Sequence, residues 1–150
     1  MAEIKLYFDG SCDNNSKFKY MGIGVAVYVN GDYSEELSYA GFEGTNGTNN
    51  VAEYLAFKKA LEILRAYVKQ NPDSIINASI YGDSQLIINQ SNGTWKVRQP
   101  HLKPYFKEVN LLRLELLDYI SKVKWIPREQ NRQADKLSTQ KVKEFIKEIM

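Results

Sequence analysis

The stretch Ile4-Lys5-Leu6-Tyr7-Phe8-Asp9-Gly10-Ser11 joins an apolar strand to an aspartate at the end of that strand. A second stretch of this kind is Ile80-Tyr81-Gly82, which is followed directly by Asp83. Acidic side chains are seldom buried, because an unpaired charge away from water costs much free energy. Two acids that end apolar strands therefore indicate a functional site at one edge of a sheet.

Two further acids lie on predicted helices. Glu53 belongs to a helical apolar pattern and has no basic residue three or four positions away. Asp135 heads a helix whose apolar stripe runs from Val142 to Ile149. Carboxylates gathered at a core edge repel one another and need a cation. Because the ligands are oxygens without a Cys/His set, they indicate a hard divalent ion such as Mg²⁺.

Each acid taken alone also fits ordinary chemistry. Asp9 could belong to a turn with Gly10, and Asp83 could be a helix N-cap. Asp135 could be a surface acid that pairs with Arg132 one turn away. Four such coincidences are improbable together, since unpaired buried acids are costly.

The apolar patterns and turn residues predict the element order βββαβααβα. The expected strands cover residues 3–8, 21–29, 33–42, 75–81 and 123–126. Three of the expected helices cover residues 49–69, 84–90 and 131–148. A further long helix is preceded by Pro100 and Pro104 and runs to about Tyr119, and its apolar mass is Leu111, Leu112, Leu114, Leu116 and Leu117. A hairpin meander beside β-α-β crossovers predicts an α/β fold with a mixed five-stranded sheet and helices on its faces.

The composition fits one globular domain over residues 1–150, with 43% hydrophobic and 25% charged residues. The net charge is only +2, but residues 94–107 hold four basic residues and no acid, and residues 122–150 hold eight against four. These local excesses of positive charge indicate contact with nucleic acid more strongly than the small net charge does. A single Cys12, with no signal-peptide pattern and no apolar run of membrane-spanning length, predicts a cytoplasmic protein without membrane contact. We expect a monomer.

Four strings of this chain, in this order, resemble type 1 ribonuclease H. The strings are Tyr7-Phe8-Asp9-Gly10-Ser11, Thr48-Asn49-Asn50-Val51-Ala52-Glu53, Gly82-Asp83-Ser84-Gln85-Leu86 and Trp125-Ile126-Pro127-Arg128-Glu129-Gln130-Asn131 with Ala134-Asp135. The resemblance covers nearly all of the chain. It implies the RNase H-like fold and cleavage of the RNA strand of an RNA/DNA hybrid by two Mg²⁺ ions, with Mn²⁺ as a possible substitute. It also implies that Asp9, Glu53, Asp83 and Asp135 are catalytic and bind the metal, with Asp9 bridging the two ions.

Polar residues beside these acids are candidates for reading the 2′-hydroxyl, the group that separates RNA from DNA. They are Asn15, Asn49, Asn50, Ser84 and Gln85. In the family, residues at similar positions contact the minor groove of the hybrid. Turn and cap chemistry is the alternative, above all for Asn15, which lies in a turn-prone run.

The segment Thr94-Trp95-Lys96-Val97-Arg98 mixes an aromatic residue with basic ones. Lys96 and Arg98 could hold the phosphates of the DNA strand while Trp95 packs on sugars. Alternatively, this is a solvated loop whose Trp95 fills the edge of the core. Some family members carry a longer basic protrusion here, so this chain resembles the short form without it.

The chain lacks the mobile histidine that many family members place before the last aspartate. The corresponding connection is Pro127-Arg128-Glu129-Gln130-Asn131, and the only histidine, His101, lies elsewhere and is expected to be structural or exposed. Arg128 can attract phosphate but stays charged, whereas Glu129 can accept a proton. Both are candidate auxiliary residues.

Two other functions keep the same fold. The domain could cleave double-stranded RNA as well as the hybrid, or it could bind the hybrid without cleaving it. Loss of one or more of the four acids would be the mark of a module that only binds, and all four are present.

Overall fold

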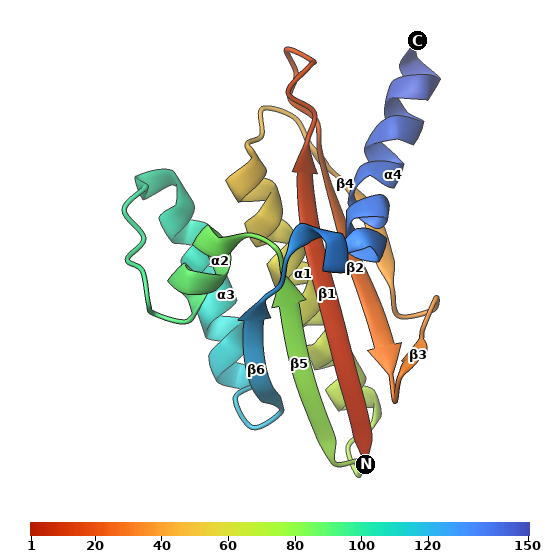
Figure 1. Cartoon of the computed structure of the whole chain (residues 1–150), viewed down its shortest axis with the longest axis vertical. Helices are drawn as coiled ribbons and strands as arrows, with labels where there is room; N and C mark the ends of the chain where they lie inside the picture. Colours follow the sequence, from red (N-terminus) through yellow and green to blue (C-terminus); the bar gives the residue numbers. More distant parts are fainter.

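The computed structural model describes residues 1–150, which form one mixed sheet flanked by helices (Figure 1). The strands are β1 (Ala2–Cys12), β2 (Met21–Val29), β3 (Asp32–Tyr33), β4 (Tyr39–Gly44), β5 (Ile76–Gly82) and β6 (Ile120–Trp125). The helices are α1 (Asn49–Gln70), α2 (Gln85–Ser91), α3 (Lys103–Glu115) and α4 (Arg132–Ile149), with short 3₁₀ turns η1 (Pro100–Leu102) and η2 (Arg128–Gln130). No helix has both the length and the apolar character needed to cross a membrane.

The sheet confirms the predicted combination of a meander and crossovers. Its strand order is β3-β2-β1-β5-β6, and β4 also pairs with β2. β1 runs antiparallel to β2 and parallel to β5, and β5 runs parallel to β6. Because Phe8 pairs with Gly82, Asp9 and Asp83 follow at neighbouring positions on the two central strands.

The predicted strand 33–42 is broken into two, so the sheet has six strands where five were expected. A turn over residues 34–38 separates β3 from β4. Ser38 Oγ accepts the Val27 N–H at 2.9 Å and donates to the Ser34 carbonyl oxygen at 2.7 Å. The serine hydroxyl thus takes the place of a ladder partner, which is how serine side chains compete with regular structure.

One face of the sheet carries the main core. Ile4, Leu6 and Phe8 of β1 are buried there, and the Phe8 ring stacks on Phe57 of α1 at 4.7 Å between centroids. α4 covers part of the opposite face, chiefly over β2 and β4 (Figure 1). Asp9 alternates with Phe8 along β1, so its side chain lies on the α4 side.

The third predicted helix differs from expectation in length and in its buried face. α3 ends at Glu115 instead of residue 119, and β6 begins at Ile120, three residues before the expected strand. Leu112 and Leu116 are buried, whereas Leu111, Leu114 and Leu117 are 58%, 60% and 67% exposed. Since α3 packs mainly against α1, Leu111 and Leu114 on its outer face stay in solvent, and Leu117 lies beyond the end of the helix.

Candidate active site

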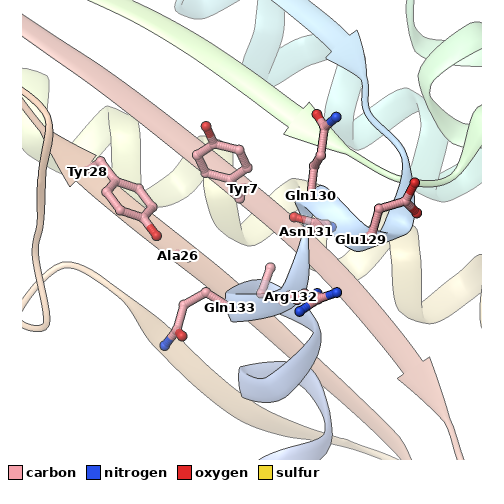
Figure 2. Close-up of a pocket in the computed structure, with 9 residues that line it drawn as sticks. Tyr7, Ala26, Tyr28, Glu129, Gln130, Asn131, Arg132 and Gln133 are labelled. Atoms are coloured by element: carbon pink, nitrogen blue, oxygen red, sulfur yellow. The ribbon is translucent and has the colours of Figure 1, made fainter.

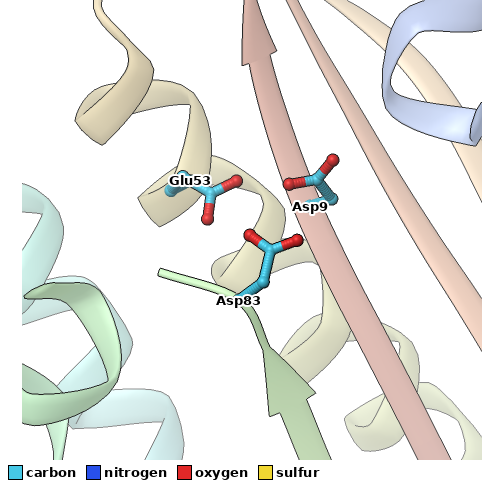
Figure 3. Close-up of side chains that lie close together, drawn as sticks. All are labelled: Asp9, Glu53 and Asp83. Atoms are coloured by element: carbon cyan, nitrogen blue, oxygen red, sulfur yellow. The ribbon is translucent and has the colours of Figure 1, made fainter. Parts of the chain in front are cut away.

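Three carboxylates from three elements meet where the pairing of β1 with β5 ends (Figure 3). Asp9 comes from β1, Glu53 from the second turn of α1, and Asp83 from the residue after β5. One oxygen of each lies within 4.8 Å of the others. The sequence prediction that these acids gather at one sheet edge is confirmed.

A close approach of α1 to β1 brings Glu53 to this point. A Cβ on Gly10 would lie 2.1 Å from the Ala52 carbonyl carbon and 2.4 Å from the Glu53 nitrogen. Only glycine leaves room for the helix backbone here. The Gly10 N–H in turn donates a hydrogen bond to Glu53 Oε1, which orients that carboxylate.

Asp135 reaches the same cavity from the first turn of α4. A Cβ on Gly24 of β2 would lie 2.4 Å from the Ala134 carbonyl oxygen, so glycine again permits the close packing of helix on strand. Asp135 lines a cavity of about 570 Å³ together with the three clustered acids. Its Oδ1 is 3.7 Å from the Arg128 guanidinium, not paired with Arg132 as the surface alternative supposed.

Burial, together with repulsion by nearby acids, raises the pKa of each clustered acid. Burial raises the pKa of Asp9 to about 7, with repulsion by Asp83 adding to the effect. The pKa of Glu53 is raised well above its ordinary value, first by burial and then by Asp9. The pKa of Asp83 is also raised by burial, although Asn131 and Arg128 oppose the shift. A site whose carboxylates resist ionisation together is one that a cation would stabilise.

The donor set fits a hard divalent ion. Glu53 Oε2 is buried and has no hydrogen-bond partner, although such an atom normally has one. A metal ion would supply the missing partner. Carboxylate oxygens are the ligands that Mg²⁺ and Mn²⁺ favour, so Asp9, Glu53, Asp83 and Asp135 are the residues that could hold them.

Two buried polar residues support the carboxylates and were not assigned a role from sequence. The Asn131 amide donates to the Phe8 carbonyl oxygen at 2.9 Å and to Asp83 Oδ2 at 3.1 Å. Ser138 Oγ lies 3.1 Å from Asp9 Oδ2. Ser138 is one helical turn beyond Asp135, and that spacing is the feature of the sequence that could have indicated a side chain on the same face of the helix.

The predicted polar residues divide into those that line the carboxylate cavity and those that do not. Asn49, Asn50 and Ser84 line it. Ser84 is also the N-cap of α2, where its Oγ accepts the Ile87 N–H at 3.3 Å, so the cap is Ser84 and not Asp83. Gln85 is exposed and does not line the cavity.

Asn15 also lies outside the cavity wall. It is exposed, and its N–H donates to Asp13 Oδ1 at 3.0 Å, which is the turn chemistry that formed the alternative. Its neighbour Asn14 lines the cavity instead.

The segment after α2 forms a separate cavity of about 340 Å³. Trp95, Lys96 and Arg98 line it, along with the buried side chain of Gln90. Trp95 is 45% exposed, which does not fit a side chain that fills the core.

The two candidate auxiliary residues face different cavities. Arg128 lines the carboxylate cavity. Glu129 lines a neighbouring cavity of about 490 Å³ on the sheet face that carries Tyr7 and Tyr28 (Figure 2). His101 is exposed in η1 and lines neither.

Known proteins are similar to this chain in sequence and in fold. A family model described as reverse transcriptase-like matches residues 8–141. The chain is 31% identical to a ribonuclease H of Caldanaerobacter subterraneus, over 97% of this chain and 94% of that protein. It is 30% identical to YpeP of Bacillus subtilis over 91% of this chain, but spans only 57% of YpeP. It likewise spans only 30% of the mycobacterial protein Rv2228c.

A solved structure agrees with this assignment. LC11-RNase H1, isolated from compost, superposes with a TM-score of 0.83 at 31% identity, covering 97% of this chain and 99% of that one. The same protein in complex with an RNA/DNA hybrid gives a TM-score of 0.79 at 30% identity, covering 91% and 94%. The family match and the sheet with its carboxylate cluster thus define a protein of the reverse transcriptase-like class. Within that class, the chain belongs to the type 1 ribonuclease H family, as its four strings predicted.

Proposed function

We propose that this domain is a ribonuclease H that hydrolyses the RNA strand of RNA/DNA hybrids with two divalent metal ions. The observation that carries the proposal is the convergence of Asp9, Glu53 and Asp83 within 4.8 Å, with Asp135 on the wall of the same cavity. The hybrid bound to LC11-RNase H1 supports the choice of substrate.

The mechanism depends on side chains that hold the metal and the substrate. When bound, two divalent ions would supply an activated water and charge neutralisation at the leaving oxygen. Asp9, Glu53, Asp83 and Asp135 would hold them, with Mg²⁺ as the expected ion and Mn²⁺ as a possible one. Asp9 comes from β1, the central strand of the sheet, and is our candidate for the shared ligand.

Substrate selection falls to the polar rim of the cavity. Asn49, Asn50 and Ser84 offer hydrogen-bond donors and acceptors within reach of a bound strand. We propose that they bind the 2′-hydroxyls of the RNA strand. Lys96 and Arg98, beside the exposed Trp95, are our candidates for the phosphates of the DNA strand. Arg128 would attract the RNA phosphates at the cavity mouth.

The proposal extends to the oligomeric state, the cellular location and a second candidate substrate of the domain. We propose that it acts as a monomer in the cytoplasm, in keeping with its single, free cysteine. Double-stranded RNA is the second candidate substrate, since a cavity that reads 2′-hydroxyls could accept an RNA duplex.

One assay tests the activity. The purified protein is incubated with RNA/DNA, RNA/RNA and DNA/DNA duplexes of one sequence, with Mg²⁺ or with excess EDTA. We expect cleavage of the RNA in the hybrid only, and none in EDTA. Cleavage that persists in EDTA would exclude the two-metal mechanism, and hybrid binding without cleavage in Mg²⁺ would identify a module that only binds.

A further inference from the structure

A buried hydroxyl on α4 lies against the central carboxylate of the site. Ser138 is fully buried, and its Oγ is 3.1 Å from Asp9 Oδ2 and 2.7 Å from the Asp135 carbonyl oxygen. A hydroxyl has one hydrogen to donate, so it serves one acceptor at a time. Hydrogen bonds to a charged acceptor are roughly twice as strong as those between neutral groups. An ionised Asp9 therefore competes well with the helix carbonyl for this hydrogen.

The backbone of Ser138 is held from two strands. Ser11 Oγ of β1 donates to the Ser138 carbonyl oxygen at 2.9 Å. A Cβ on Gly22 of β2 would lie 2.0 Å from that same oxygen, so the strand and the helix are in close contact here. These contacts fix the backbone of Ser138 without help from Asp9, which is what a supporting residue requires.

The orientation of the Asp9 carboxylate is consistent with support by the Ser138 hydroxyl. Figure 3 shows one Asp9 oxygen directed toward Glu53 and Asp83 and the other directed away from them. With Oδ2 bonded to Ser138, rotation of the carboxylate is restricted and one oxygen stays available to the cluster.

We propose that Ser138 is a positioning residue that holds Asp9 through its Oδ2 and so prepares the carboxylate cluster for divalent metal. This inference rests on the proposed function, since the metal is the ion that the cluster would take. Hydrogen-bond partners of metal-binding carboxylates typically change metal affinity or activity by 10–100-fold when removed.

The first test measures metal binding directly. Wild-type protein and Ser138→Ala are titrated with Mn²⁺ alone, by calorimetry and by the electron paramagnetic resonance of free Mn²⁺. We expect about tenfold weaker binding in Ser138→Ala. The matched control is Ser79→Ala, which removes the other buried serine hydroxyl, 3.3 Å from Ser121 Oγ in the sheet, and should bind Mn²⁺ like wild type. Equal affinity of Ser138→Ala and wild type would overturn the proposal.

The second test needs neither metal nor substrate. Thermal unfolding in EDTA at pH 8 is measured for wild type, Ser138→Ala, Asp9→Ala and the double variant. If Ser138 donates to Asp9, the change in Tm caused by Ser138→Ala should depend on whether Asp9 is present. Identical changes in both backgrounds would contradict the contact. Because this cycle is independent of cleavage, it tests Ser138 even if the hybrid assay were negative.

Discussion

At Asp9, burial dominates the pKa of the carboxyl. The carboxyl is 6% exposed, and burial raises its pKa from 3.8 to about 7; a hydrogen bond with Glu53 opposes the shift, and repulsion by Asp83 and Asp135 adds to it. A raised pKa means that the folded protein binds the proton more tightly than the unfolded chain does. The associated stability is therefore fully present below about pH 4 and is lost as the pH rises through about 7.

Asp9→Asn should abolish hybrid cleavage and stabilise the metal-free fold at high pH. The amide cannot ionise, so it removes one like charge from the cluster. In EDTA at pH 8 we expect the variant to exceed wild type by on the order of 2 kcal/mol, and at pH 4 the two should converge. Urea unfolding across this pH range is the measurement. Near-normal turnover, or a stability difference that does not change with pH, would remove Asp9 from the repulsive cluster.

Among the elements, the connection from β6 to α4 carries the most concentrated set of site residues. η2 turns the chain so that Arg128 and Glu129, adjacent in sequence, line different cavities. Asn131 then precedes α4 as its N-cap residue, and its side-chain amide donates hydrogen bonds to the Phe8 carbonyl oxygen of β1 and to Asp83. The helix continues with Asp135 and Ser138, spaced by nearly one turn, so one element supports two carboxylates and supplies another.

The position of η2 separates the roles of its two charged residues. Arg128→Ala should raise KM several-fold with little change in kcat, because a phosphate-attracting charge acts mainly on binding. Glu129→Gln should leave both constants near wild type, since Glu129 faces the Tyr7 cavity and not the carboxylates. Steady-state kinetics on hybrid substrate decide the matter. A large fall in kcat for Glu129→Gln alone would restore the sequence-based expectation that this residue transfers a proton.

For the whole molecule, the distribution of charge matters more than the net value of +2. The acids of the carboxylate cavity offset part of the basic charge, which is concentrated around Trp95 and along the last 29 residues. The carboxylate cavity adjoins the N-terminus of the short helix α2 at Ser84, and the Trp95 cavity is lined by Leu86 and Gln90 of the same helix. This arrangement suits a duplex that spans both, with one strand at each.

Neutralising Lys96 and Arg98 together should weaken hybrid binding and flatten its salt dependence. Each phosphate contact contributes close to one unit to the slope of log K against log salt, so the slope should fall by about one to two. Lys69→Gln is the control, because Lys69 lies sixteen residues after Glu53 on α1, about 24 Å along the helix axis. Binding measured in increasing KCl provides the slopes. An unchanged slope in the double variant would assign this segment to solubility.

The sequence by itself determined the mixed sheet, the family and the order of the elements, apart from the break between β3 and β4. These features depend on local patterns: alternation in strands, 3.6-residue spacing in helices, and turn residues between them. The grouping of the four acids could also be predicted, because each stands at the end of a predicted strand or in the early turns of a predicted helix, where α/β folds bring chain segments together.

Only the tertiary structure decided which polar groups support those acids. Asn131 reaches Phe8 across 123 positions of sequence, and Ser138 reaches Asp9 across 129. The break at Ser38, the exposure of Leu111 and the direction of Glu129 likewise depend on which surfaces meet in space. Hydrogen bonds and close approaches between distant segments are set by the packing of whole elements, and no local pattern in the chain encodes them.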